Sequence, residues 1–316
     1  MQNTTDPDSA NFSSPLNNGL AVKAFLSMTP CFSFLYVNVI MMFTLRSKEI
    51  FCETPRYILF GQLLLSESLQ LSSSILSYLL ALARLYLVSY GCALYYLIQR
   101  IINAISPLFL ALMSLERYIA ICFPLRHAAI ANRRRTTVAV IVVWLLGMFI
   151  WIVELTARMM LEILSPNKQV FCLDYGHVQI EISFSISQTF TGIIFVSVSL
   201  VTVYTYIAIL VTAKSATSNK TSASKAHRTI LLHMVQLALC LVSTLFSLLR
   251  RSLAVSKLRP VVIYQVQYVL FVSVIIFPRC LSPLIYGLRD KTFCAAFKYN
   301  FLFCMNRKVE PAACVV

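Results

Sequence analysis

Long apolar runs dominate the chain, and polar residues gather in the short segments between them. A helix needs about 20 predominantly apolar residues to cross the hydrocarbon core of a bilayer. The runs are continuous and lack the alternation of apolar and polar residues that marks a membrane β-barrel. The pattern therefore predicts an all-α membrane protein with seven spans, at Leu20–Leu45, Pro55–Ala83, Cys92–Ile121, Thr137–Ala157, Ile182–Thr212, Thr229–Leu249 and Val261–Tyr286.

A shorter helix is expected after the seventh run. One stripe of residues recurs there at helical spacing, namely Phe293, Ala296, Phe297, Asn300, Phe301 and Cys304. Lys291 and Lys298 lie off this stripe, which is typical of an amphipathic helix on the inner leaflet of a membrane. The chain then divides into an extracellular N-terminus (residues 1–19), a seven-helix domain (20–288) and a cytoplasmic tail (289–316).

The charges between the runs predict this orientation. Only 12% of the residues are charged, about half the fraction usual in a soluble domain. The net charge of +15 lies in short loops, where it sets membrane orientation and gives no reason to expect a nucleic-acid partner. The cytoplasmic side carries Arg46, Lys48, Arg126, Arg133, Arg134, Arg135, Lys214, Lys220, Lys225, Arg228, Arg289, Lys291 and Lys298. One loop opposes this assignment, because the outer segment before the seventh run contains Arg250, Arg251, Lys257 and Arg259.

The N-terminal segment is polar and lacks the basic start of a signal peptide, so the first run is expected to act as the insertion signal. Two sequons for N-glycosylation, at Asn3 and Asn11, agree with an extracellular N-terminus. A third sequon at Asn219 would face the cytosol and remain unmodified.

The third run has a polar face that should point into the bundle. Counting back from Arg117 by helical steps gives Met113, Leu110, Ser106, Asn103, Gln99, Tyr96 and Cys92 on one side. Arg117 lies 25 residues after Cys92, about 37 Å along a helix, so the two residues reach opposite membrane surfaces. Cys92 and Cys172 are the cysteines near the outer surface, and they either form a disulfide bond or remain two free thiols.

Several charges lie within or at the ends of spans, where an unpaired charge is costly. Glu67 in the second span and Arg279 in the seventh are expected to approach each other in the middle of the bundle. Glu116 and Arg117 are adjacent at the inner end of the third span, where they either form a resting pair or extend separately to the interface.

The segment Met113–His127, which reads Met-Ser-Leu-Glu-Arg-Tyr-Ile-Ala-Ile-Cys-Phe-Pro-Leu-Arg-His, strongly resembles the inner end of the third helix in rhodopsin-like G-protein-coupled receptors. Together with Cys92, Trp144 and Pro283–Asp290, it is similar to the odorant-receptor family, most like a teleost branch. The resemblance covers the chain from the first span to the amphipathic helix. Span six departs from most rhodopsin-like families because it has no proline.

The resemblance implies roles for individual residues. It implies a Cys92–Cys172 bridge and an activation switch at Pro283 and Tyr286, although Pro283 could equally form a static kink. Glu67 would stand where most receptors have the aspartate of a sodium site, and Arg279 would then replace the sodium ion. The implied contacts with a heterotrimeric G protein, of the olfactory stimulatory type, are Glu116, Arg117, Tyr118, Phe123, Pro124, Leu125 and Arg126.

A small-molecule odorant would bind in the outer half of the bundle. Candidate ligand-binding residues are Gln99, Arg100, Asn103, Ser187, Gln188, Thr191, Ser247, Tyr264 and Tyr268. Arg100 is about two and a half turns inside the outer end of its span and needs a partner. That partner is either an anionic group of the ligand or an internal acid, Glu154 or Glu181.

Other functional classes fit less well. A rhodopsin-like receptor for a non-odorant small molecule remains the main alternative. A transporter is disfavoured because the chain shows neither an internal repeat nor paired broken helices. The scattered histidines have no metal-ligand spacing, and no arrangement of residues indicates an enzyme or a cofactor site. The expected location is the plasma membrane.

Overall fold

The computed structural model describes residues 14–83, 86–162, 169–171, 181–216, 260–277, 279–281 and 290–305, with the single positions Val235, Ala238 and Val242. Five predicted spans coincide with the helices α1 (Ser14–Arg46), α3 (Pro55–Leu82), α4 (Ser89–Cys122), α6 (Arg133–Glu162) and α8 (Glu181–Ala216). The seventh predicted span begins as α10 (Pro260–Leu270) and continues into the π-helical segment η3 (Phe271–Ile276). Of the sixth span, the three single positions are helical.

Within the described residues, four helical segments are long and apolar enough to cross a membrane. They are Phe25–Arg46, Leu97–Cys122, Arg133–Thr156 and Thr189–Thr212. Helix α3 is not among them, and its middle carries polar residues that are buried in the bundle. These residues are Ser66, Glu67, Ser68, Gln70 and Ser74.

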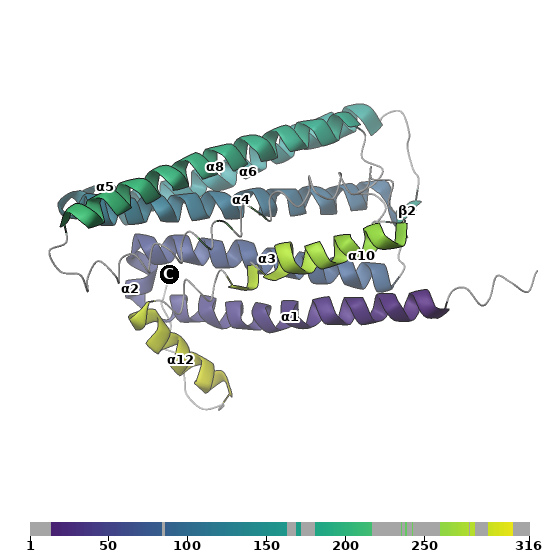
Figure 1. Ribbon diagram of the computed structural model, residues 1–316, viewed down its shortest axis with the longest axis horizontal. Coiled ribbons are helices and arrows are strands. Elements are labelled where there is room, and N and C mark those ends of the chain that lie inside the picture. Colours follow the sequence, from purple (N-terminus) through teal and green to yellow (C-terminus); the bar gives the residue numbers. More distant parts are fainter. Residues whose placement is uncertain are drawn as a thin grey trace, which may run out of the picture.

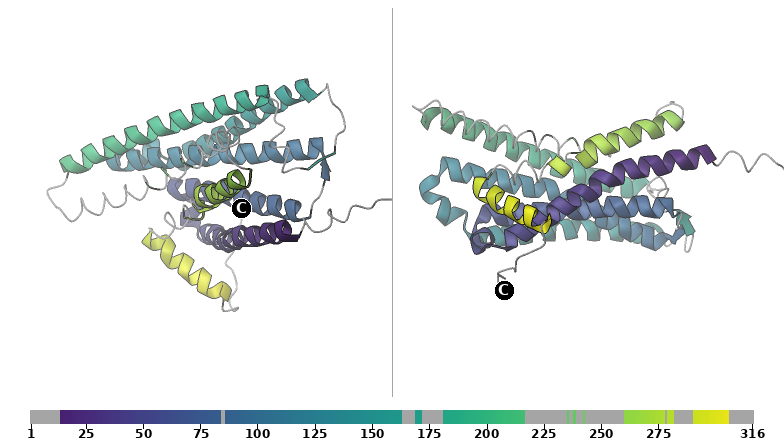
Figure 2. Two further views of the ribbon diagram at one scale, coloured as in Figure 1. Left: turned by 45° about the vertical axis from the view of Figure 1, so that its right-hand side comes forward. Right: turned by 90° about the horizontal axis from the view of Figure 1, so that it is seen from below.

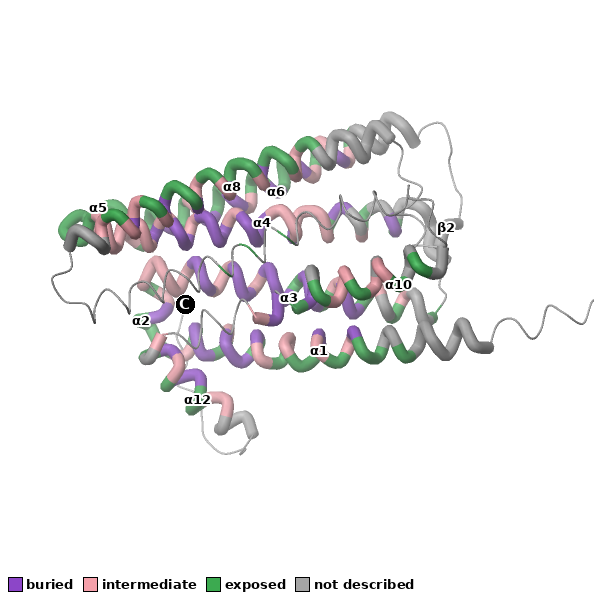
Figure 3. The backbone as a smooth tube through the Cα atoms, in the orientation of Figure 1, coloured by how far each residue is buried: buried purple, intermediate pink, exposed green. Residues whose placement is uncertain are grey.

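The long helices run side by side with α4 at the centre (Figure 1). Helix α1 packs on α3, α3 packs on α4, and α4 also contacts α6 and α8. The Trp144 indole of α6 donates a hydrogen bond to Gln62 Oε1 of α3 at 3.0 Å and its ring meets Phe109 of α4 edge to face. Buried positions lie between the helices, and the outer sides of α6 and α8 are exposed and apolar (Figure 3). Such surfaces suit a bilayer, because lipid tails provide an apolar solvent for them.

Short elements close the two ends of the bundle. At one end, β1 (Tyr86–Val88) pairs antiparallel with β2 (Gln169–Phe171), with Tyr86 opposite Phe171. At the other end lie α2 (Glu49–Glu53), the 3₁₀ turn η2 (Pro124–Arg126) and α5 (His127–Ile130). The strand pair is a small departure from the all-helical prediction, and it forms where the loops before α4 and after α6 meet.

The predicted amphipathic helix is present as α12 (Lys291–Met305), which leaves the bundle at an angle to the long helices (Figure 2). Phe293, Ala296 and Phe297 of the predicted stripe are buried, whereas Lys298 is exposed. Phe293 packs edge to face against Phe51 and Phe60, with ring centroids 5.7 Å and 5.6 Å apart. The apolar stripe of α12 therefore packs against the C-terminal half of α1, against α2 and against the first turns of α3.

Candidate functional site

The C-terminal end of α4 carries the predicted acid and arginine as a pair. Arg117 Nε lies 3.4 Å from Glu116 Oε2, and Glu116 is 8% exposed. The other carboxylate oxygen, Oε1, lies 3.6 Å from Nε2 of His127 in α5. The sequence alone assigns no role to His127, because its approach to Glu116 depends on the turn at η2. The carboxylate thus stands between two basic side chains.

The loop after α4 presents its side chains outward. Phe123, Pro124, Leu125 and Arg126 are all exposed, and Leu125 is completely so. Tyr118 anchors the start of this loop, because its ring packs edge to face on Phe123 and on Tyr204 of α8, at 5.7 Å and 5.8 Å. We call Glu116–Arg126, the last turns of α4 together with η2, the α4–η2 segment.

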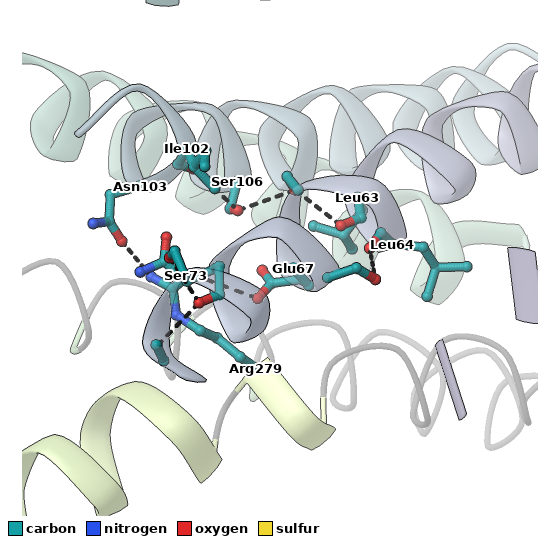
Figure 4. A network of polar contacts seen from close by, with 12 residues as sticks. Leu63, Leu64, Glu67, Ser73, Ile102, Asn103, Ser106 and Arg279 are labelled. Atoms are coloured by element: carbon teal, nitrogen blue, oxygen red, sulfur yellow. Dashed lines mark hydrogen bonds and ion pairs between the residues drawn. The ribbon is translucent and has the colours of Figure 1, made fainter. Parts of the chain in front are cut away.

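The structure brings Glu67 and Arg279 together in the middle of the bundle. Both side chains are buried, and Arg279 Nη1 lies 3.8 Å from Glu67 Oε2. The other terminal nitrogen, Nη2, donates a hydrogen bond of 2.6 Å to Oδ1 of Asn103. Figure 4 shows the guanidinium between Asn103 on α4 and Glu67 on α3. One arginine of the seventh span therefore joins three spans, and Asn103, which the sequence suggested as a ligand contact, is a partner of that arginine.

The N-terminal half of α4 contributes to a second charge pair, in which the acid is buried and the arginine is partly exposed. Arg100 Nε lies 3.8 Å from Oε1 of Glu154 on α6, and Glu154 is buried. Of the two alternatives for Arg100, the structure therefore shows the internal acid. The side chain of Glu181, the other acid considered, lies outside the described residues.

Further ligand candidates are distributed over several helices. Gln99 Nε2 donates to the hydroxyl of Tyr95, one turn earlier on α4, at 2.5 Å, and to Ser77 Oγ of α3 at 3.3 Å. Ser27 of α1 donates to the Tyr268 hydroxyl of α10 at 3.2 Å, and Thr191 of α8 is half-buried. The predicted site residues that lie outside the described side chains are Asn3, Asn11, Cys172, Ser187, Gln188, Ser247, Tyr264, Pro283 and Tyr286.

Cys92 is buried in the first turn of α4 and is disulfide-bonded. Its partner lies outside the described residues. The strand β2 ends at Phe171, which pairs with Tyr86. Tyr86 lies a few residues before Cys92 in the chain. The strand β2 is therefore held beside the N-terminal end of α4.

A polar cluster at the start of α12 has no counterpart in the sequence predictions. The Tyr57 hydroxyl donates to Asp290 Oδ2 at 2.8 Å, and Arg56 Nη1 lies 2.6 Å from the same oxygen. Oδ1 accepts hydrogen bonds from the amides of Thr292 and Phe293, so Asp290 caps α12. Burial raises the pKa of Asp290, but the Tyr57 hydrogen bond, the Arg56 charge and the two amides together lower it below its ordinary value.

The family model described as "7 transmembrane receptor (rhodopsin family)" matches residues 25–286 and confirms the seven-helix architecture that the apolar runs predict. Odorant receptor 131-2 of Danio rerio is 35% identical to this chain over 275 residues, which cover 85% of the chain and 82% of the relative. Olfactory receptor 4K17 of Homo sapiens is 26% identical, with 82% and 84% covered, and olfactory receptor 4M1 of Mus musculus is 26% identical, with 69% and 70% covered.

Proposed function

Because the chain belongs to the rhodopsin family of seven-transmembrane receptors and is similar to odorant receptors over most of its length, we propose that it is an odorant receptor. It binds a small molecule in the outer half of the bundle and activates a heterotrimeric G protein at the cytoplasmic face. Membership of this family implies a multi-pass protein of the plasma membrane. The family consists of receptors and not of enzymes.

The finer topology is part of the proposal. The N-terminus is extracellular and glycosylated at Asn3 and Asn11, and the C-terminus is cytoplasmic. Support comes from the basic loops on one side of the membrane and from the exposed basic residues Arg133, Arg134 and Arg135 at the start of α6. Cys172 is the partner of Cys92, because it directly follows β2 at the outer end of α4. This bridge holds the second outer loop over the bundle.

The coupling role rests on the geometry of the α4–η2 segment. In the resting state the Glu116 carboxylate holds the Arg117 guanidinium close to α4. Activation releases Arg117, which then contacts the G protein together with the exposed residues of the following loop. The G protein is of the olfactory stimulatory type, so the cellular output is a rise in cyclic AMP.

Arg279 and the end of span seven complete the activation mechanism. The guanidinium of Arg279 supplies a positive charge beside Glu67, where other receptors of the family use a sodium ion. Span seven changes shape at Pro283 and Tyr286, since a proline frees a backbone carbonyl within a helix. The bundle then opens at its cytoplasmic end.

The test is a panel of odorants applied to cells that express the chain with a cyclic AMP reporter. We expect at least one odorant to raise cyclic AMP, and Arg117→Ala to abolish the response at unchanged surface expression. Arg134→Ala serves as a matched control, because Arg134 is exposed and lies on α6. A response that survives in Arg117→Ala, or a solute flux independent of any G protein, would contradict the proposal.

A further inference from the structure

Three polar side chains lie near the outer ends of spans three and four. Arg100 is about one turn inside the apolar segment Leu97–Cys122 of α4, and Trp151 and Glu154 lie in the last two turns of Arg133–Thr156 of α6. Trp151 and Glu154 are three residues apart, so they share one side of α6. In the proposed topology all three residues lie in the outer half of the membrane.

Two atoms of this cluster are buried without a hydrogen-bond partner in the described part of the chain. They are Oε2 of Glu154 and the indole Nε1 of Trp151. Glu154 is only 2% exposed. A buried carboxylate oxygen and a buried N–H group are costly to leave without partners. A ligand that supplies a donor for the oxygen and an acceptor for the N–H would therefore bind favourably. The cluster therefore offers one strong acceptor and one donor.

The two charged side chains of the cluster form a long ion pair. Arg100 Nε and Glu154 Oε1 are 3.8 Å apart, which is longer than a charge-assisted hydrogen bond. The Arg100 side chain is 28% exposed, whereas that of Glu154 is 3% exposed. The two charges cancel, and a ligand with a single net charge would therefore leave one charge unbalanced in a low-dielectric site. A ligand that carries both charges matches the pair.

We propose that Arg100, Trp151 and Glu154 form a binding site for a small zwitterion, a molecule with one ammonium and one carboxylate group. The ammonium group donates to Oε2 of Glu154. The carboxylate accepts from the Arg100 guanidinium and from the Trp151 indole. This site deepens the proposed receptor function and rests on it, because it defines the chemical class of the ligand that the receptor detects.

The experiment uses the full-length receptor with an N-terminal tag for surface expression and a sensor of G-protein dissociation that does not presuppose the G-protein type. The twenty common α-amino acids are the probes. For the most potent of them, two further probes are the same molecule without the carboxylate and the same molecule without the ammonium group. For leucine these are 3-methylbutylamine and 4-methylpentanoate. We expect both singly charged probes to be at least tenfold weaker on the wild-type receptor.

Removal of either charge should then change which probe the receptor prefers. Glu154→Gln removes the acid and leaves Arg100, so it should lose at least tenfold in sensitivity to the amino acid and respond to the carboxylate probe. Arg100→Gln should respond to the amine probe instead. Ile152→Val on the exposed side of α6 should leave all responses unchanged. If the ion pair only stabilises the fold, neither charge variant should gain a response to a singly charged probe.

The failures of the two proposals are distinguishable. If no amino acid evokes a response but another odorant does, and Arg117→Ala abolishes it, the receptor function holds and the zwitterion site is wrong. Equal sensitivity of the wild type to the amino acid and to either singly charged probe would also overturn the site, even where the variants fail to reach the surface. If no compound evokes an Arg117-dependent response, the receptor function fails with it.

Discussion

The imidazole Nε2 of His127 lies 3.6 Å from Oε1 of Glu116, the carboxylate oxygen that faces away from the 3.4 Å contact with Arg117. The Glu116 carboxylate therefore contacts two basic side chains, Arg117 of α4 and His127 of α5. Its hold on Arg117 depends on the loop that follows α4, because that loop positions His127. The loop that would meet the G protein is thus in contact with the resting pair.

Glu116→Gln should raise signalling in the absence of ligand. The change removes the negative charge that holds Arg117 while it preserves the size of the side chain. A partly exposed ion pair contributes about 1 kcal/mol, which corresponds to a roughly fivefold shift between resting and active states. The measurement is basal cyclic AMP normalised to surface expression.

His127→Phe is the matched variant for this prediction. It leaves Glu116 charged and removes the competing partner, so Arg117 can use both carboxylate oxygens and basal cyclic AMP should not rise. An equal rise in both variants would show that the loop, and not the carboxylate, restrains Arg117. A fall in Glu116→Gln would contradict the resting-pair interpretation.

Charge exchange tests the pair between Glu67 and Arg279. Removing one partner of a buried pair leaves an uncompensated charge, which costs about 3–5 kcal/mol. We expect Glu67→Gln and Arg279→Gln each to lose most of their surface expression. The double exchange of Glu67→Arg with Arg279→Glu should recover part of it. Flow cytometry of a tagged receptor measures the outcome.

Asn103→Ala is the control for the charge exchange. It removes only the oxygen that accepts from Arg279 Nη2 at 2.6 Å and leaves both charges in place. It should therefore lower surface expression less than either single charge variant. If the double exchange gave no recovery while Asn103→Ala was as damaging as the single charge variants, the hydrogen bond would matter more than the ion pair.

Whether the sequence predicts a polar pair depends on how many partners each side chain could have. Glu67 and Arg279 could be matched because an apolar run gives a buried charge few possible partners. Arg100 remained open between a ligand and an internal acid, since either satisfies the same requirement. The contact of Tyr57 with Asp290 joins residues 233 positions apart, and neither residue lies in a pattern that marks it as paired. Such contacts depend on how a loop turns, which hydrophobic periodicity does not encode.

The carboxyl group of Asp290 should make the docking of α12 dependent on pH. Its pKa is lower in the folded protein than its ordinary value of 3.8. The charged form is therefore favoured by folding, and its contribution is present above pH 3.8 and is lost as the pH falls through the lower folded pKa. In detergent solution, Asp290→Asn should be less stable than the wild type at pH 7, and the difference should shrink below about pH 4.

Labelling of Cys294 provides a local measurement of the same effect. This free thiol lies in the first turn of α12, and its amide donates to the Asp290 carbonyl at 2.7 Å. We expect faster labelling in Asp290→Asn than in the wild type. Lys298→Gln, on the exposed side of α12, should label at the wild-type rate. Equal rates in all three proteins would show that Asp290 does not hold the helix in place.

Two glycines in the spans should respond differently to the same substitution. A Cβ atom at Gly147 of α6 would lie 3.1 Å from Cδ1 and Cγ1 of Ile105 and 3.2 Å from Cγ2 of Ile101. Small residues let membrane helices approach closely, so α4 and α6 meet here because no side chain separates them. At Gly192 of α8, nothing lies within 4 Å of an added Cβ. Gly147→Leu should therefore overpack the bundle and destabilise it by about 1–3 kcal/mol or more, whereas Gly192→Leu should have little effect.

The measurement for this pair is thermal stability of the purified receptor together with surface expression. Adding Ile105→Ala to Gly147→Leu should recover part of the lost stability, because it removes the two carbon atoms closest to the new side chain. Ile105→Ala alone should destabilise the receptor, since Ile105 is fully buried. A double variant that is less stable than both single variants would mean that the close approach of α4 and α6 is not where the strain arises. That result would also weaken the proposed ligand site, because the contact between Arg100 and Glu154 requires the same two helices to lie together.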